Sequence, residues 1–423
     1  MPTKGKIMEN IKEYVLGLCK EVKAAQRTLA SLNTDKKNDA LKRIAAALTE
    51  NADLIISENI KDIKASEGII PKTMVDRLTL NYDRIAAISE SLIQVASLPD
   101  PVGQGSVTVR PNGLKITKTS VPIGVVGMIY EARPNVTVDA AALCIKSGNG
   151  AVLRGGKEAV NTNRALIKVM KDALAQSAVP SNVIALIDDV TREGTNALMS
   201  MKGYVDVLIP RGGKGLIKAV VENATVPVIE TGAGNCHIYI DEFADLDKSV
   251  AVAINAKLSR PSVCNAVETM LVHKAVAKDF LPMFTEKAKS HALEIRGCTE
   301  TCKLLPDAIA VTEADYETEF DDYILAIRVV EGLDEAIEHI RKYTTGHSEA
   351  IMTESYANAT RFCRELDAAA VYVNASTRFT DGGEFGFGAE IGISTQKLHT
   401  RGPMGLAELT TVKYIVEGDG QVR

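Results

Sequence analysis

The sequence lacks any apolar run long enough to cross a membrane. Its longest such run, Val121–Tyr130, is interrupted by Pro122 and two glycines and falls well short of the roughly 20 residues that a membrane helix needs. The segment Met1–Tyr14 has no apolar core of the kind found in secretion signals. We therefore expect a soluble, cytoplasmic protein with no membrane partner.

An excess of positive charge is also missing. The 423 residues carry 49 Lys and Arg against 54 Asp and Glu, a formal net charge of −5. Nucleic-acid-binding domains usually carry a basic surface, so nucleic acid is not expected as a partner. The contents of hydrophobic (46%) and charged (24%) residues are those of a globular chain, and its length predicts two to three domains of roughly 150 residues each.

The seven cysteines form no disulfide or metal-binding pattern. They are widely and irregularly spaced, and an odd number cannot pair completely, which indicates a reduced chain with at least one free thiol. Cys298 and Cys302 form C-x-x-x-C, but no second pair and no suitably spaced His accompany them, so no metal site is predicted. Cys19, Cys144 and Cys363 lie in apolar helical patterns and are expected in the core.

The first hundred residues are expected to be mainly helical, because Asp35–Ala65 contains few helix breakers and an apolar stripe at helical spacing. Further on, Ser106–Val109 and Leu114–Thr119 alternate apolar and polar residues around a Pro-Asn-Gly turn, which predicts a β-hairpin. The tail Thr410–Val416 alternates in the same way and could pair with that hairpin or with another subunit.

Beyond Pro122, short apolar segments alternate with amphipathic ones, a pattern typical of a parallel sheet covered by helices on both faces. Helices are expected at Thr162–Ala175 and Thr191–Ser200. The predicted strands of the first α/β unit are Gly124–Ile129, Ala151–Leu153, Val183–Ile187, Val205–Ile209 and His237–Ile240. A second α/β unit, roughly 245–400, has strand signals at Thr269–Val272, Ile324–Val330 and Val371–Val373.

Two Arg-Gly-Gly-Lys turns follow predicted strands, where ligands of such sheets bind. They consist of Arg154, Gly155, Gly156 and Lys157, and of Arg211, Gly212, Gly213 and Lys214. Glycines at a strand end let backbone N–H groups approach an anion, and a following helix and the basic side chains add favourable charge. A cofactor phosphate site is favoured over a basic surface turn. An ATP-binding P-loop is not, since Glu158 stands where Ser or Thr would bind magnesium.

Cys264 has the surroundings of a nucleophile. It lies in Ser259–Ala266 (SRPSVCNA), four residues after Arg260 and, by expectation, just before a helix. A helix N-terminus and an Arg both favour the thiolate, although packing remains the alternative. The glycine-rich segment Thr231–Asn235 leads into a strand and is expected to bring backbone close to a ligand. No histidine signature accompanies Cys264, so papain-like proteolysis is not expected.

Five segments, in order along nearly the whole chain, resemble the γ-glutamyl phosphate reductases, also called glutamate-5-semialdehyde dehydrogenases, a family within the aldehyde dehydrogenase superfamily. They are Val121–Asn135, Lys146–Lys157, Val228–Asp241, Ser259–Ala266 and Phe385–Leu406. The resemblance implies an α/β fold with a Rossmann-type cofactor domain (1–105 and 121–235), an α/β catalytic domain (236–404) and a small β oligomerisation flap (106–120 and 405–423).

The resemblance also implies a reaction. L-Glutamyl 5-phosphate is reduced by NADPH to L-glutamate 5-semialdehyde with release of phosphate, the second step of proline biosynthesis from glutamate. Cys264 matches the nucleophile, which forms an acyl thioester. Asn135 matches the asparagine whose side-chain amide forms the oxyanion hole with the Cys264 N–H. The implied partners are further copies of the chain, in a homo-oligomer, and glutamate 5-kinase in a transient contact.

The cofactor residues follow from the same resemblance. Gly212 and Gly213, beside Lys214, fall where the superfamily has its pyrophosphate turn, and Glu319 aligns with a glutamate that holds the nicotinamide ribose. Many NAD-using relatives have a Lys and, three positions later, a Glu at the adenine ribose, where this sequence has Arg154 and Lys157. A carboxylate there would repel a 2′-phosphate that Lys157 attracts, so NADP(H) is the expected cofactor.

The ends of the substrate match no motif. Arg133, Arg260, Arg378 and Arg401 are candidates because the ligand carries carboxylate and phosphate charge, and each is equally open to a structural role. Glu230 stands where hydrolytic aldehyde dehydrogenases keep their general base. Two alternatives therefore stay open: a hydrolytic NAD(P)-dependent aldehyde dehydrogenase that uses Glu230, and a non-catalytic oligomeric scaffold.

Overall fold

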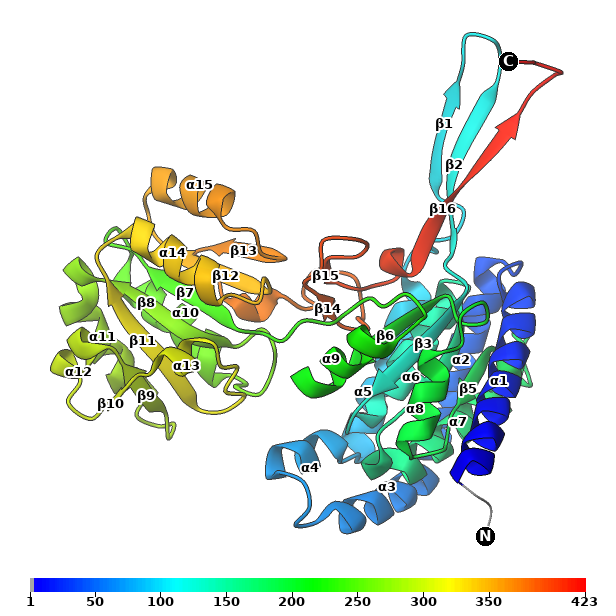
Figure 1. The fold of residues 1–423 in the computed structure, drawn as a ribbon, viewed down its shortest axis with the longest axis horizontal. Helices are drawn as coiled ribbons and strands as arrows, with labels where there is room; N and C mark the ends of the chain where they lie inside the picture. The colour runs from blue at the N-terminus through cyan, green and yellow to red at the C-terminus, as the bar shows by residue number, and fades with distance from the viewer. Residues whose placement is uncertain (1–3) are drawn as a thin grey trace. The chain divides into compact units, whose positions relative to one another are not determined.

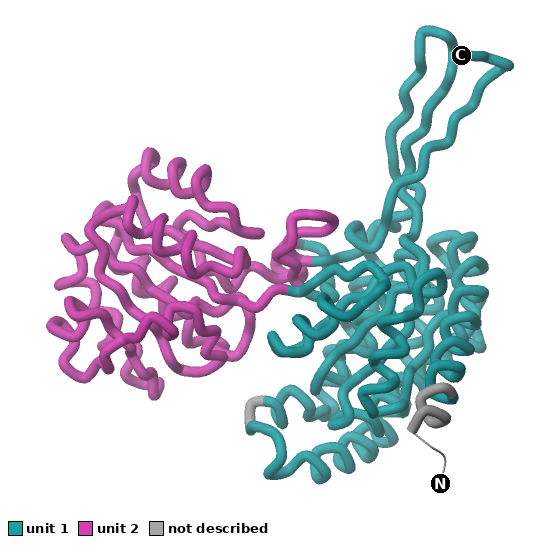
Figure 2. The backbone as a smooth tube through the Cα atoms, in the orientation of Figure 1, with its two compact units in different colours: residues 1–231, 386–392, 404–423 teal, residues 232–385, 393–403 magenta. Residues whose placement is uncertain are grey.

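The structure is a computed structural model that describes residues 4–423, without the side chains of residues 4–9, 72 and 73. Contacts divide the chain into two compact units (Figure 2). The first comprises Met1–Thr231, Gly386–Gly392 and Met404–Arg423, and the second Gly232–Phe385 and Ile393–Pro403. Both contain parallel sheets, which confirms the α/β fold class. The finer division into three domains stays a prediction.

A four-stranded parallel sheet forms the centre of the first unit (Figure 1). Its strands, in spatial order, are β5 (Ile184–Leu186), β4 (Gly150–Arg154), β3 (Val125–Tyr130) and β6 (Val207–Arg211), all four of which overlap predicted strands. Val126 and Met128 of β3 enter one core, while Val125 and Ile129 enter another. Successive side chains of a strand point to opposite faces, so this sheet is covered on both.

Helices supply the two outer layers of the first unit. One face is covered by α2 (Thr34–Glu50), α5 (Tyr82–Ser97), α6 (Pro134–Lys146) and α7 (Val160–Leu174), and the other by α1 (Lys4–Leu29), α8 (Arg192–Met199) and α9 (Lys214–Asn223). The unit also contains α3 (Ala52–Ser66), α4 (Lys72–Leu78), η1 (Lys157–Ala159), η2 (Ser181–Val183) and η4 (Ala407–Leu409). The predicted helical segment Asp35–Ala65 is thus two helices, and Asn51 separates them.

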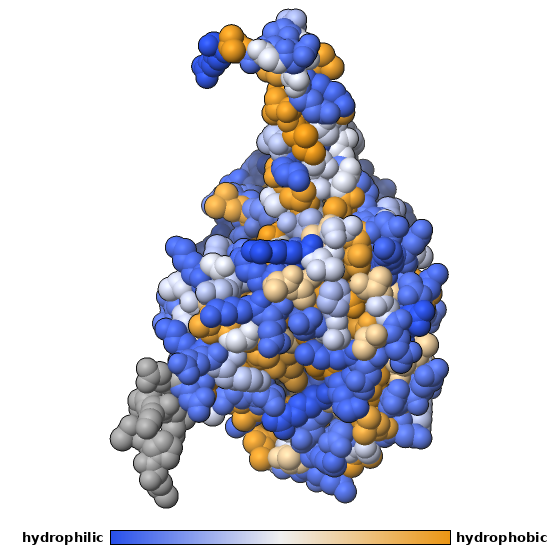
Figure 3. Space-filling model, turned by 90° about the vertical axis from the view of Figure 1, so that its right-hand side faces the viewer, coloured by the Kyte–Doolittle hydropathy of each residue, from blue (hydrophilic) through white to orange (hydrophobic). Residues whose placement is uncertain are grey.

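A three-stranded antiparallel sheet, which we call the flap, belongs to the first unit. It consists of β1 (Gly105–Val109), β2 (Lys115–Pro122) and β16 (Thr410–Glu417), in the order β1-β2-β16. The hairpin prediction is confirmed, and the tail pairs with that hairpin. Figure 3 shows apolar side chains on the surface of this sheet; its exposed residues include Val107, Val109, Val412, Tyr414, Ile415 and Val416.

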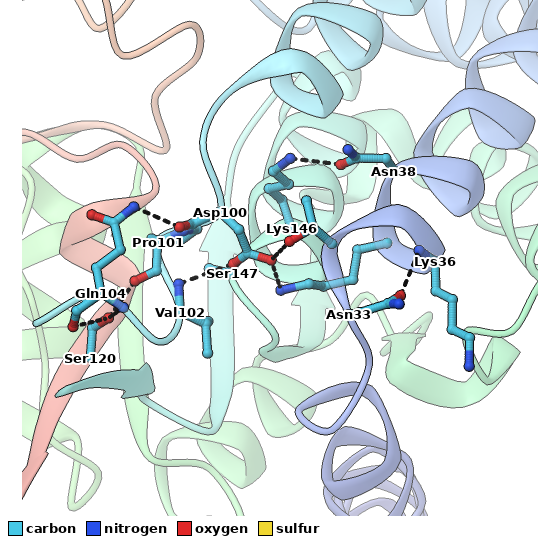
Figure 4. Close-up of polar contacts among 12 residues, drawn as sticks. Asn33, Lys36, Asn38, Asp100, Pro101, Val102, Gln104, Ser120, Lys146 and Ser147 are labelled. Atoms are coloured by element: carbon cyan, nitrogen blue, oxygen red, sulfur yellow. Dashed lines mark hydrogen bonds and ion pairs between the residues drawn. The ribbon is translucent and has the colours of Figure 1, made fainter.

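Buried polar contacts fix the root of the flap (Figure 4). Lys37 of α2, which is only 2% exposed, forms an ion pair of 2.5 Å with Asp100. Lys146 of α6 donates to Asn38 at 2.6 Å and to the carbonyl of Ala96 at 2.8 Å, and its burial lowers its pKa. Ser120 of β2 donates to the Pro101 carbonyl. Ser120 thus connects β2 to the loop at residues 100–101, and Lys37 connects that loop to α2.

The second unit is built on a seven-stranded parallel sheet. Its order is β10 (Ile309–Ala310), β9 (Glu294–Gly297), β11 (Ile324–Val330), β8 (Val267–His273), β7 (Cys236–Ile240), β12 (Ser348–Met352) and β13 (Ala370–Val373). One face is covered by α10 (Leu246–Leu258), α11 (Lys274–Ala288) and α12 (Thr299–Leu304), and the other by α13 (Glu313–Tyr316), α14 (Leu333–Tyr343) and α15 (Tyr356–Glu365). The remaining elements are η3 (Thr377–Phe379), β14 (Ile393–Ser394) and β15 (Gly402–Pro403).

Two expectations about the chain can be compared with this fold. Within residues 4–423, no helix is both long and apolar enough to span a bilayer. Cys19 and Cys144 are fully buried, as predicted. The prediction of a core position for Cys363 is wrong: it is exposed on α15, whose apolar side is turned inward through the neighbouring Phe362.

Candidate active site

Both Arg-Gly-Gly-Lys turns lie at the carboxyl edge of the sheet in the first unit. Strand β3 runs between β4 and β6, and its last residues, Ile129 and Tyr130, pair with Arg154 and Arg211. Helix α6 begins shortly after the same edge, at Pro134. The prediction that the turns follow strands is therefore confirmed, and the sheet places both turns beside the loop that leads to Asn135.

In the first turn, the arginine braces the backbone and the lysine faces solvent. The Arg154 guanidinium donates to the carbonyls of Gly155 and Thr191, both at 2.9 Å, and burial lowers its pKa. Gly155 is packed so closely that a Cβ would approach the Asn163 amide nitrogen to 2.2 Å. Lys157 begins η1 and is exposed. Arg154 thus shapes the turn, while the ammonium group of Lys157 is accessible to an anion.

The second turn packs against the loop that follows β3. The Gly213 N–H donates to Glu131 at 2.9 Å, and a Cβ on Gly212 would come within 2.4 Å of the same carboxylate oxygen. Lys214 is exposed and is the first residue of α9. An anion at this turn therefore has a lysine and a helix N-terminus available, but it must compete with Glu131 for the Gly213 N–H.

Asn135, in the first turn of α6, is held by its own helix. Its side-chain amide donates to Asp139 at 3.0 Å. Burial raises the pKa of Asp139 to about 6, while the hydrogen bond from Asn135 and the charge of Arg211 oppose that rise. One amide hydrogen of Asn135 is thereby engaged, which fixes the orientation of the group. Arg133 stands immediately before this helix and is half-buried.

The second unit contains the cysteine nucleophile predicted from the sequence. Cys264 is half-buried in a turn between α10 and β8, which we call the nucleophile turn (residues 262–266). The expectation that a helix follows it is wrong, because Val267 begins a buried strand. A helix dipole therefore does not contribute to the reactivity of Cys264, and any activation has to come from side chains and backbone near the turn.

Close packing on the carbonyl of Cys264 holds the nucleophile turn. A Cβ on Gly234 would lie 1.5 Å from this carbonyl oxygen, so only glycine fits there. The Cys236 thiol donates to the same oxygen at 3.2 Å. On the other side, the Asn265 amide donates to the carbonyls of Arg378 (3.2 Å) and Thr380 (3.0 Å). The glycine-rich segment thus packs its backbone against Cys264, the predicted nucleophile, and its closeness to a ligand stays a prediction.

Arg378 lies within electrostatic reach of Cys264 and of a second arginine, Arg260. The Arg378 guanidinium donates to Ser259 at 3.2 Å and to the side-chain oxygen of Asn265. Burial lowers the pKa of Arg378 and the positive charge of Arg260 lowers it further, whereas the thiolate charge of Cys264 acts in the opposite direction. Concentrated positive charge beside a thiol favours the thiolate and attracts an anionic substrate.

Glu319 also belongs to this cluster. It lies half-buried in the segment between α13 and β11, and its carboxylate accepts the Gly234 N–H at 2.8 Å. The residue expected at the cofactor ribose is thus one contact away from the backbone that packs on Cys264. Sequence reasoning did not anticipate this link, because residues 234, 264 and 319 are far apart along the chain.

Arg401 and Glu230 are the remaining candidates. Arg401 donates to the Asp367 carboxylate at 2.6 Å and to its carbonyl at 2.7 Å. Glu230 is half-buried and, like Asn135, belongs to the first unit, whereas Cys264 belongs to the second. The described part of the chain contains no cluster of three or more His, Cys, Asp or Glu able to hold a metal ion.

A family model described as the aldehyde dehydrogenase family matches residues 3–300. A gamma-glutamyl phosphate reductase from Carboxydothermus hydrogenoformans is 59% identical over 413 residues, which cover 97% of this chain and 100% of that protein. Its counterpart from Clostridium acetobutylicum is 56% identical over 98% of this chain and its own full length. The chain belongs to the aldehyde dehydrogenase family.

Solved structures agree with membership of the aldehyde dehydrogenase family. The crystal structure of a gamma-glutamyl phosphate reductase from Thermotoga maritima superposes with a TM-score of 0.93, at 50% identity over 97% of this chain and 99% of that one. An engineered glycolyl-CoA reductase with bound NADP⁺ has a TM-score of 0.71 at 16% identity, a likeness of fold alone. Enzymes of the aldehyde dehydrogenase family use a nicotinamide cofactor.

Proposed function

We propose that this chain catalyses the NADPH-dependent reduction of L-glutamyl 5-phosphate to L-glutamate 5-semialdehyde and phosphate. Support comes from relatives of more than 50% identity over nearly the full chain, which are named gamma-glutamyl phosphate reductase. The observation that carries the proposal is the cluster around Cys264, because Arg260 and Arg378 suit a substrate with carboxylate and phosphate groups. The cytoplasmic location stays a prediction.

The residues present fit a nicotinamide cofactor. In the first unit, two glycine turns at the carboxyl edge of a parallel sheet carry the exposed Lys157 and Lys214, groups that suit phosphates. A Cβ on Gly155 would approach the amide nitrogen of the buried Asn163 to 2.2 Å, so the first turn has to stay free of a side chain at this position. In the second unit, Glu319 offers a carboxylate for ribose hydroxyls. We assign these residues, with Gly213 and Arg154, to the cofactor.

Catalysis begins with covalent chemistry at Cys264. Its thiolate forms a bond to the acyl carbon of the substrate, the acyl carbon–oxygen bond breaks, and phosphate leaves with the bonding electron pair. Arg260 and Arg378 stabilise the negative charge on the departing group. The Asn135 amide and the Cys264 N–H are the donors assigned to the substrate oxygen. NADPH, when bound, supplies the hydride for the thioester.

The final step regenerates the nucleophile. After reduction, the negatively charged oxygen of the thiohemiacetal re-forms the carbonyl, the carbon–sulfur bond breaks, and the electron pair returns to Cys264 as a thiolate. The one proton taken up in the net reaction ends on phosphate. Covalent catalysis in this form divides one difficult reduction into two easier steps. Glu230 has no role as a general base in this reaction, because the water that it would activate would hydrolyse the thioester.

The preference for NADPH over NADH is assigned to Lys157. It is the exposed basic residue of the first turn, whereas Arg154 is engaged with two carbonyls and contributes mainly to the shape of that turn. A lysine ammonium near the adenine ribose favours the extra 2′-phosphate through its charge. The two basic residues thus have different roles: Lys157 recognises the phosphate, and Arg154 holds the backbone.

The partner assigned to the flap is a second copy of the chain. Strands β1 and β16 are the two edges of the flap sheet, and apolar residues such as Val107, Val412 and Tyr414 are exposed on it. Exposed apolar strands at an edge are a means of association between chains. Replacing Val412 and Tyr414 by lysine should lower the molar mass measured by light scattering; an unchanged mass would contradict this assignment. The contact with glutamate 5-kinase stays a prediction.

A phosphate-dependence assay tests the proposed reaction. With glutamate 5-semialdehyde and NADP⁺, formation of NADPH should require inorganic phosphate and should yield the acyl phosphate. Formation of NADPH with free glutamate in the absence of phosphate would instead favour the hydrolytic alternative and a role for Glu230. A protein that is inactive under both conditions would favour the scaffold.

A further inference from the structure

A buried ion pair flanks the nucleophile turn and takes no part in the proposed chemistry. Lys257, in the last turn of α10, and Glu268, near the start of β8, are 0% and 1% exposed, and their nitrogen and oxygen lie 2.5 Å apart. Lys257 precedes Cys264 by seven residues and Glu268 follows it by four. Lys257 and Glu268 therefore bracket Cys264 along the sequence.

Stability alone does not account for this pair. Moving two charges out of water costs several kcal/mol per ion, and well-packed apolar residues in their place are often neutral or stabilising. The backbone nevertheless adapts to Glu268. The register between β7 and β8 shifts from Cys236 opposite Val267 to His237 opposite Thr269, which leaves Glu268 as the extra residue of a bulge. Bulges re-aim side chains and are frequent beside active sites.

The second oxygen of Glu268 reaches the segment that carries Glu319. It accepts the N–H of Asp321 at 3.3 Å. Asp321 adopts φ of 55°, a left-handed conformation that few residues other than glycine adopt. Asp adopts this conformation more often than most residues, and contacts that fix its backbone help to hold it. The carboxylate of Glu268 provides one of these contacts, since it holds the Asp321 N–H from inside the core.

Glu319, two residues before Asp321, connects this segment to the nucleophile turn. Its carboxylate accepts the Gly234 N–H at 2.8 Å, and Gly234 packs directly on the Cys264 carbonyl. A continuous series of contacts thus runs from the buried pair, through the 319–321 segment, to the nucleophile turn. Every member of the series belongs to the second unit.

We propose that Lys257 and Glu268 form a positioning pair that orients Glu319 for the ribose at the nicotinamide end of the cofactor. This inference rests on the proposed function, which assigns Glu319 to that ribose. Lys257 compensates the charge of the buried Glu268 carboxylate, and Glu268 accepts the Asp321 N–H, so that the segment presents Glu319 to the cofactor and to Gly234 together. Neither residue of the pair touches a reacting atom.

Two double variants separate positioning from bulk stability. A single substitution would leave one buried charge uncompensated, which is strongly destabilising. In K257M/E268Q the charges are gone, but the glutamine oxygen can still accept the Asp321 N–H. In K257M/E268L the volume is similar and that acceptor is lost. The two proteins therefore differ mainly in one hydrogen bond to the 319–321 segment.

NADPH binding is the readout, measured by cofactor fluorescence on the full chain. K257M/E268L should bind NADPH about 10-fold more weakly than wild type, the effect of losing about 1.4 kcal/mol. K257M/E268Q should bind NADPH within about threefold of wild type. Its KM for the acyl phosphate should change no more than that of K257M/E268L. Equal NADPH affinity in all three proteins would overturn the proposal, whatever their melting temperatures.

Hydrogen exchange on the wild-type protein provides a second measurement, which does not depend on how the variants fold. NADPH should slow the exchange of peptides that contain residues 232–236 and 317–323 together. Protection of neither segment in NADPH-saturated protein would also overturn the proposal. Both readouts measure binding, so they are independent of whether wild type reduces glutamyl phosphate, which tests the proposed function separately.

Discussion

Gly234 lies so close to the Cys264 carbonyl that a Cβ at position 234 would stand 1.5 Å from its oxygen. The two residues come from different segments, the glycine-rich loop before β7 and the turn before β8. Their contact sets the position of Cys264 relative to the loop whose Gly234 N–H is bound by Glu319. The conformation of the nucleophile turn therefore depends on residues distant in sequence.

Substitution of Gly234 by alanine should displace the nucleophile turn. Since the obstructing atoms are backbone, they can make room only by moving the turn, and a displacement of about 1 Å costs on the order of 10²-fold in rate. We expect kcat to fall by about that factor. Gly17→Ala in α1, where a Cβ would meet nothing within 4 Å, is the matched control and should leave kcat unchanged. Full activity in Gly234→Ala would contradict the packing argument.

Reversing the charge of Lys157 should weaken the preference for NADPH. Lys157→Glu should raise the KM for NADPH about 10- to 100-fold, through loss of one charge-assisted contact and gain of a repulsion. The KM for NADH should change much less. Lys168 is an exposed lysine on α7 of the same unit, and Lys168→Glu is the control. Equal efficiency with the two cofactors in wild type would refute the role of Lys157.

Arg378 and Arg401 should differ in their effect on substrate binding. Arg378→Lys keeps the charge but loses the planar contacts to Ser259 and Asn265, so the KM for the acyl phosphate should rise about 10-fold. Arg401→Lys should change it less than about threefold, because Arg401 is engaged by Asp367. Steady-state kinetics at saturating NADPH would measure both; the reverse ranking would move the anion site to Arg401.

The stability of the protein should depend on pH through Asp139. Its folded pKa of about 6 lies above the unfolded value of 3.8, so between these values the folded state binds more protons. The contribution of Asp139 to the free energy of unfolding is thus most favourable below about pH 4, and it is lost as pH rises through 6. Asp139→Asn should gain stability relative to wild type between pH 4 and 7, by about 1–2 kcal/mol after allowance for the partial exposure of the residue.

Urea unfolding at pH 4.5 and 7.5 measures this effect. Asp172→Asn, at an exposed position on α7, serves as the control and should show no such difference between the two pH values. A free energy of unfolding for Asp139→Asn that runs parallel to wild type across this range would mean that Asp139 is ionised with little penalty. Asn135 would then be held by an ordinary carboxylate.

Much of the sheet framework could be predicted from the sequence, for a physical reason. Strand β11 was predicted with the bounds that the structure has, because Ile324–Val330 is an almost continuous apolar run. Strand β12 was not predicted, because the polar residues Ser348 and Glu349 interrupt the apolar pattern of a buried strand. Glu349 is nevertheless buried, and it accepts from the His237 ring at 3.0 Å. A polar strand residue whose partner is far away in sequence leaves no local pattern.

The candidate site shows the same limit. Cys264 and the two glycine turns could be found from motifs, but the segment after Cys264 was predicted as a helix. The structure has β8 there, which overlaps the strand signal at Thr269–Val272, so only the helix expected directly after Cys264 is wrong. Asn265 and Gly234 were not predicted as residues that hold the nucleophile, because their roles lie in contacts with distant carbonyls.

Alkylation of the cysteines, mapped by mass spectrometry, tests the central claim most directly. Iodoacetamide should modify both Cys264 and the exposed Cys363. Glutamate 5-semialdehyde should protect Cys264 alone, and loss of activity should follow modification of Cys264. Cys363 serves as the internal control, since it should react equally with and without the aldehyde. Inactivation that follows another cysteine, or full turnover by Cys264→Ala, would contradict the account.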